Sequence, residues 1–247
     1  MRWVGVLVCA LLTMSYADFV ELPEGFASYI NDPQALVVAS PGRSGSTLLV
    51  KAVAKAAGGR AVLKTHQFVP KEFQGKALFI FSQPDRAAES ALHKLLEDEA
   101  FGELHFQHLF SSDKKWLAEM GHDTRKQSLY HNLLAYDALG TGIHLQKWLF
   151  DWVVPAPKET AQILAIKYER LWDVETQEAI RTFCHLDSFE LPQKKERGCE
   201  EKKMSSLELL LRRVYNEERK KPPEYKAYDY ARQLWEKAPP FQFLSQI

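Results

Sequence analysis

The chain has 247 residues, of which 46% are hydrophobic and 26% charged, a composition typical of a folded globular protein. This length suits one sizeable α/β domain and is short for two. Its 32 basic residues balance its 32 acidic residues, which argues against nucleic acid or an anionic membrane surface as a partner, so any anion binding must be local.

The N-terminal residues 1–17 have the pattern of a secretory signal peptide. Arg2 supplies a positive charge, Trp3 to Met14 is almost entirely apolar, and Ser15-Tyr16-Ala17 places small residues around a cleavage site. The apolar stretch is shorter than the roughly 20 residues of a membrane-spanning helix. We therefore expect a cleaved signal peptide, with a short signal anchor as the alternative, followed by a domain over residues 18–247.

The stretch from Leu36 to Leu49 predicts a buried strand, a tight loop and the start of a helix that runs to about Gly58. The apolar run before the loop suits a strand covered on both faces. Gly42 and Gly45 permit backbone conformations that other residues disfavour, and they let a ligand approach closely.

The chemistry of this loop suits an anionic ligand. Ser46 and Thr47 fall where the helix begins, so their hydroxyls and the first backbone N–H groups converge at the positive end of the helix dipole. Arg43 adds a planar cationic fork that fits phosphate or sulfate oxygens. The loop lacks the lysine of a Walker A motif. The alternative interpretation is an ordinary strand–turn–helix junction with a serine cap.

Three further strands are predicted at Arg60–His66, Ala77–Phe81 and Ile163–Leu171. Strands that alternate with helices imply parallel βαβ units. Ligands of open α/β sheets bind beyond the carboxyl ends of the strands, so Lys64, Thr65 and His66 are placed to share a site with the loop. His66 is there either a general base or a polar residue at a strand end.

The remaining segments read mostly as helices. We expect helices from about Ala87 to Leu96, within residues 113–154, from Glu175 to Cys184, and from Ser205 to the pair Pro222-Pro223. A last aromatic-rich segment, with Tyr225, Tyr228, Tyr230 and Trp235, is expected to pack back on the domain.

The cysteines fit an exported chain. Cys9 would leave with the signal peptide, and Cys184 and Cys199 bracket a short polar stretch that a disulfide could close in an oxidising lumen. Two unrelated free thiols are the alternative. No Cys/His spacing typical of a zinc site occurs, and no metal is expected.

Several of these segments resemble sulfotransferases that use 3′-phosphoadenosine 5′-phosphosulfate (PAPS). Pro41–Leu49 is similar to the 5′-phosphosulfate loop of that family. Lys64-Thr65-His66 resembles the element that supplies the catalytic base in cytosolic-type members, and Ile166–Leu171 resembles a later strand with an acidic turn. Ser90 matches the serine of the motif that binds the 3′-phosphate of the donor.

The resemblance, which covers about Leu36 to Leu186, implies a single domain with a P-loop-type parallel sheet flanked by helices. It implies that His66 acts as general base, while Lys64 and Arg43 stabilise charge on the transferred group. The expected donor contacts come from the loop and from the segment after the third strand: Gly42, Arg43, Ser44, Gly45, Ser46, Thr47, Arg86 and Ser90.

One position departs from the family pattern. Ser82 stands where these enzymes carry an arginine that binds the 3′-phosphate. Losing such a partner weakens binding by roughly 1.5–3 kcal/mol, the scale of a hydrogen bond to a charged group. Arg86 or Arg197-Gly198 are candidates to replace it.

The function implied is transfer of a sulfuryl group from PAPS to an acceptor hydroxyl of a carbohydrate, protein or small molecule. The signal segment places this reaction in the secretory pathway, in the Golgi lumen or outside the cell. Two alternatives stay open. One is a P-loop phosphotransferase that uses a nucleoside triphosphate, which the missing Walker lysine disfavours. The other is a non-catalytic relative, for which Ser82 is the main argument.

Overall fold

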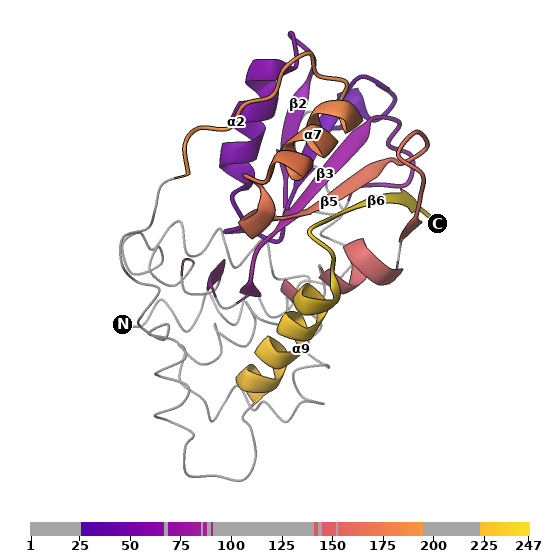
Figure 1. Cartoon of the computed structure of the whole chain (residues 1–247). Helices are drawn as coiled ribbons and strands as arrows, with labels where there is room; N and C mark the ends of the chain where they lie inside the picture. The colour runs from indigo at the N-terminus through magenta and orange to yellow at the C-terminus, as the bar shows by residue number, and fades with distance from the viewer. Residues whose placement is uncertain are drawn as a thin grey trace, which may run out of the picture.

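The computed structural model describes residues 26–66, 69–84, 86–87, 90, 141–142, 145–151, 153–194 and 223–247. Within these residues the chain has an α/β fold built on a six-stranded, mostly parallel mixed sheet with a few helices (Figure 1). The strand order is β2-β1-β3-β5-β6-β4. The strand nearest the centre of the predicted site, β1, therefore has a neighbour on each side.

The parallel part of the sheet contains the strands that the sequence predicts. β1 spans Leu36–Ala39, β2 spans Val62–Thr65, β3 spans Lys76–Phe81 and β5 spans Ile163–Lys167. Each pairs in parallel with its neighbour, and Ala39 at the end of β1 lies opposite Thr65 of β2 and Phe79 of β3. The segments that follow these strands consequently emerge at one edge of the sheet.

The other side of the sheet corrects the prediction of a wholly parallel arrangement. β6, Phe241–Gln246, runs antiparallel to β5, and β4, Val153–Pro155, runs antiparallel to β6. β4 occupies the end of the stretch expected to be helical up to residue 154. The final aromatic-rich segment is a helix, α9, whose first residue is Pro223. Proline suits the first turn of a helix because its missing N–H has no intrahelical acceptor there.

Both faces of the sheet are covered, which explains its continuous apolar strands. Leu36 and Val38 of β1 point to one face, and Val37 and Ala39 point to the other. The first face packs against α2, Ser46–Ala56, and α7, Val174–Phe183. Figure 1 shows these two helices on the same side of the strands. The second face packs against η3, Lys147–Asp151, and the C-terminal half of α9, which spans Pro223–Lys237.

The helix bounds agree closely with expectation where the structure describes them. α2 ends at Ala56, and Gly58 and Gly59 follow with positive φ, a conformation that stops a helix. α7 begins one residue before Glu175 and ends one residue before Cys184. Two short 3-10 helices complete the described fold: η2 at Ala27–Tyr29 and η4 at Tyr168–Arg170.

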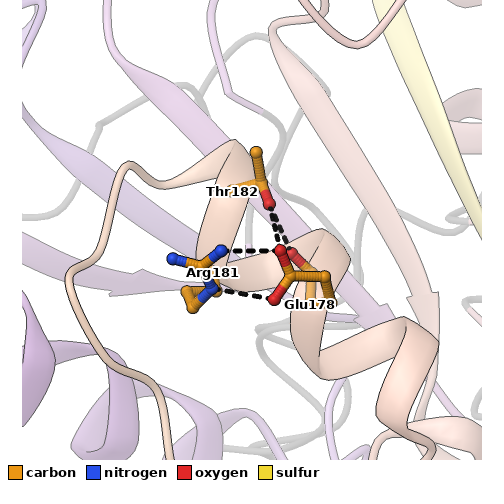
Figure 2. Close-up of polar contacts among 3 residues, drawn as sticks. All are labelled: Glu178, Arg181 and Thr182. Atoms are coloured by element: carbon orange, nitrogen blue, oxygen red, sulfur yellow. Dashed lines mark hydrogen bonds and ion pairs between the residues drawn. The ribbon is translucent and has the colours of Figure 1, made fainter.

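The exposed side of α7 carries a local polar cluster (Figure 2). Arg181 donates two hydrogen bonds to the Glu178 carboxylate, with lengths of 2.8 and 2.7 Å, and Thr182 Oγ1 donates to the same carboxylate at 3.1 Å. These hydrogen bonds, that from Arg181 first, lower the pKa of Glu178 to about 2. These polar side chains bond to one another on the solvent side of α7, and the apolar side of the helix packs against the sheet.

Several predicted features lie outside the described residues. They are the signal segment, most of the helices expected from Ala87 to Leu96 and within residues 113–154, the helix expected from Ser205, and the alternative phosphate contact at Arg197-Gly198. No helix in the described part of the chain combines the length and apolar character needed to cross a bilayer.

Candidate functional site

The loop between β1 and α2 has the unusual backbone that its sequence predicts. φ is +104° at Gly42, +48° at Arg43 and +78° at Gly45. The left-handed region costs a non-glycine residue roughly 1–2 kcal/mol, so Arg43 is held there against its own preference. Strain of this kind gathers at functional sites, where the surrounding fold sustains it.

The loop delivers the chain to the N terminus of α2. Gly45 is the N-cap residue, and its carbonyl accepts the backbone N–H groups of Leu48 and Leu49 at 3.0 and 3.1 Å. The N–H groups of Ser46 and Thr47 belong to the first helical turn, where no carbonyl of the same helix can reach them. Glycine has no side chain to cap these donors, so the turn suits an external anion.

Lys64, from the end of β2, reaches this helix start. Its Nζ donates a hydrogen bond of 3.0 Å to Thr47 Oγ1. Partial burial, followed by the nearby positive charge of Arg43, lowers the pKa of Lys64 below its usual value. The positive charge of Arg43 therefore acts on Lys64 as a repulsion. An anion placed between them would relieve that repulsion.

His66, just beyond β2, lies against the first residue of the loop. Its Nδ1 lies 3.0 Å from the backbone oxygen of Ser40 and 3.3 Å from Ser40 Oγ. A carbonyl oxygen only accepts, so the short contact requires the Nδ1 proton, and the lone pair of the neutral ring is then on Nε2. His66 is thus held in the tautomer that can take a proton through Nε2.

Arg43 joins the loop to the segment after β3. Its Nε and one terminal nitrogen donate to Ser90 Oγ at 3.1 and 2.7 Å. Two predicted donor-binding residues 47 positions apart are therefore in direct contact. Arg86, which was expected as a substitute for the missing family arginine, is exposed on the same segment as Ser90. The residue that contacts Ser90 is Arg43.

The departure at Ser82 has a structural counterpart inside the fold. Ser82 and Ser44 are both buried, and their hydroxyl oxygens lie 3.2 Å apart. Ser44 Oγ also donates to the carbonyl of Gly42 at 2.8 Å. These small hydroxyls tie the end of β3 to the underside of the loop, a place that an arginine side chain could not occupy without opening the packing.

Two residues of η4 complete the site, and sequence reasoning gave them no role. Glu169 Oε1 accepts the backbone N–H of Gln83 at 2.8 Å. The ring of Tyr168 lies against Gly45, so closely that a Cβ built there would collide with it. Their place after a predicted parallel strand could have indicated them, because β5 is parallel to β3 and the turn after it emerges at the same end of the sheet.

The structure describes one of the two cysteines of the predicted disulfide. Cys184 is a free, fully buried thiol beyond the last turn of α7, and burial raises its pKa to about 12. Its expected partner, Cys199, lies outside the described residues, so the bridge stays a prediction.

Among the residues that the structure describes, no group of three or more His, Cys, Asp or Glu side chains is arranged to hold a metal ion. Comparison with known proteins adds no identity: no family model, curated protein or solved structure matches the chain.

Proposed function

We propose that this protein is a PAPS-dependent sulfotransferase of the secretory pathway, built as a single P-loop-type domain over residues 18–247. It transfers a sulfuryl group to the hydroxyl of a carbohydrate, protein or small molecule. The observation that carries the proposal is the convergence of Arg43, Lys64 and the N terminus of α2 on one strained loop. That arrangement suits a tetrahedral anion, and the link from Arg43 to Ser90 extends it toward a second anionic group.

The donor would lie across the carboxyl edge of β1, β2 and β3. The 5′-phosphosulfate would bind the loop from Gly42 to Thr47, including Arg43, and Ser90, whose hydroxyl accepts from Arg43, would contact the 3′-phosphate. Arg86 lies on the same segment as Ser90 and is exposed, so its side chain has room to turn toward the same phosphate. In this arrangement Arg86 is the residue that would take over the role of the family arginine that Ser82 replaces.

The reaction is an in-line displacement at sulfur. The acceptor oxygen forms a bond to sulfur while the bond from sulfur to the bridging phosphate oxygen breaks, releasing adenosine 3′,5′-bisphosphate. His66 Nε2 takes the acceptor proton, because Nδ1 already donates to Ser40. Lys64 and Arg43 stabilise the charge that develops on the bridging and outer oxygens.

Thermal unfolding of the purified protein with adenosine 3′,5′-bisphosphate tests the donor site. Ligand at about 100 times its dissociation constant adds roughly 2.7 kcal/mol to stability. For a domain of this size each kcal/mol raises Tm by about 2–4 °C. We expect a shift of that order in the wild type and its loss in Arg43→Ala. Arg181→Ala, which removes an exposed cation from the surface of α7, should leave the shift intact.

The other outcomes separate the alternatives. A shift with magnesium ATP but none with the bisphosphate would replace the proposal by the phosphotransferase. No shift with either ligand would support a non-catalytic protein, with the buried Ser44–Ser82 pair as the structural reason. Equal shifts in wild type and Arg43→Ala would show that the ligand binds elsewhere.

A further inference from the structure

We propose that η4, the turn after β5, positions the two halves of the donor site: Tyr168 sets the loop, and Glu169 sets the segment that carries Ser90. The inference rests on the proposed function, because it concerns how that site distinguishes two anionic groups of one ligand. Neither residue is placed in contact with the donor. Both are positioning residues that act through the backbone of their neighbours.

Tyr168 fixes the loop from behind. Its ring occupies the space beside Gly45 and packs edge-on against Trp172, with ring centroids 5.4 Å apart and planes at 83°. The ring also packs against the apolar cluster between the sheet and α2 and α7. Because packing on several sides leaves the ring little freedom, it holds Gly45, and with it the N–H groups that begin α2, in one place.

Glu169 fixes the segment after β3. Its Oε1 accepts the N–H of Gln83, and the carbonyl of Gln83 accepts the N–H of Ala87 at 3.1 Å. The carboxylate is therefore at the start of a helical turn that leads to Ser90, where a negative charge is favourable. The sheet sets the reach of this contact, because Phe81 at the end of β3 pairs with Lys167 at the end of β5.

The second carboxylate oxygen of Glu169 shows that the contact with Gln83 costs folding free energy. Oε2 is buried and, among the described residues, has no hydrogen-bond partner. A buried acceptor without a partner opposes folding. A carboxylate kept in this setting needs another reason, and holding Gln83 relative to the loop supplies one. The hydrogen bond from Arg43 to Ser90 joins the loop, which Tyr168 positions, to the segment after β3, which Glu169 positions.

Two ligands separate the two roles. Adenosine 3′,5′-bisphosphate uses both parts of the site, whereas adenosine 5′-monophosphate lacks the 3′-phosphate and uses the loop alone. We expect Glu169→Asp to lower the preference for the bisphosphate by roughly tenfold, with monophosphate affinity within about twofold of wild type. Aspartate keeps the charge but is one methylene too short to reach Gln83.

Matched variants control for simple destabilisation. Glu169→Gln retains a side-chain oxygen that can accept from Gln83, and we expect it to restore most of the preference. Tyr168→Ala should weaken both ligands by a similar factor and leave the preference unchanged, while Tyr168→Phe should behave as wild type. Isothermal titration calorimetry on the folded variants gives both affinities for each.

The results separate failure of this inference from failure of the proposed function. A wild-type preference that Glu169→Asp and Glu169→Gln preserve equally would overturn the positioning role and leave the donor site standing. Loss of both ligands to the same extent in the Glu169 and Tyr168 variants would also overturn it, because it would indicate general destabilisation. A wild-type protein that binds neither ligand would overturn the proposed function and the inference together.

Discussion

Gly45 is the residue at which the loop, α2 and η4 meet. It has φ +78°, and a Cβ added there would collide with the ring of Tyr168. We predict that Gly45→Ala lowers the free energy of unfolding by roughly 2–5 kcal/mol, combining the left-handed backbone cost with the cost of overpacking. Denaturant unfolding of the purified variant measures this loss.

Gly58 provides the matched control. It also has positive φ, +61°, but no atom lies within 4 Å of a Cβ built on it. Gly58→Ala should therefore lose only the backbone term, roughly 1–2 kcal/mol. Equal losses in the two variants would contradict the close packing of Tyr168 on the loop.

At the scale of single residues, the sequence predicted which side chains the candidate site contains but not the contacts among them. Arg43, Lys64 and His66 could be placed because each lies in a glycine-rich turn or at the end of a recognisable strand. The Arg43–Ser90 bond could not, since it joins positions 47 apart whose approach depends on the pairing of β1 with β3. The resemblance alone left Ser82 as a missing arginine; the structure adds its burial against Ser44.

Among the described elements, β4 and β6 are the strands that the sequence did not reveal. β6 pairs antiparallel with both β5 and β4, and these two pairings extend the parallel sheet by two strands. Three of the four predicted strands, β1, β3 and β5, are almost continuous apolar runs buried on both faces, which a sequence displays directly. β6 contains two glutamines and a serine, and β4 has three residues, so neither gives a pattern that local reasoning separates from its surroundings.

We predict that Leu244→Ala in β6 lowers the free energy of unfolding by about 2–5 kcal/mol, the usual cost of truncating a buried aliphatic side chain. Leu244 is fully buried in the cluster between the sheet and α9. Ile247→Ala makes a similar truncation three residues later at a side chain that is 64% exposed, and should change stability by less than about 0.5 kcal/mol. Paired denaturant titrations compare them, and similar values would show that β6 is not part of the core.

On the scale of the whole molecule, the two ends of the parallel strands contribute differently to the protein. The carboxyl ends of the parallel strands carry the candidate site, and the opposite edge anchors α7. There Lys76, the first residue of β3, donates to the carbonyl of Phe183 at 2.9 Å and lies 3.0 Å from His185 Nε2. Arg60 donates to the carbonyl of Cys184 at 2.6 Å. Cations at these positions satisfy carbonyls at the end of α7 and complement its dipole.

This anchor makes the stability of the fold depend on pH. An ammonium group only donates, so the Lys76 contact requires a neutral His185 that accepts through Nε2. The charge of Lys76, then burial, then the charge of Arg60 lower the pKa of His185. In the unfolded chain the pKa of a histidine is about 6.5. Because the native pKa of His185 is lower, the unfolded state binds more protons than the native state just below that pH. The stability that His185 contributes is therefore present above that pH and is lost as the pH falls through its lower native pKa.

We predict that Tm falls more steeply between pH 7.5 and 5.5 in the wild type than in His185→Asn. Asparagine tolerates the positive φ of 51° at this position, so the variant removes the titration without adding much backbone strain. Differential scanning calorimetry across this range gives the two slopes. Parallel slopes would show that other groups carry the pH dependence. A wild-type Tm that instead rises as the pH falls would show that the native state binds protons more readily than the unfolded chain, which contradicts a lowered native pKa for His185.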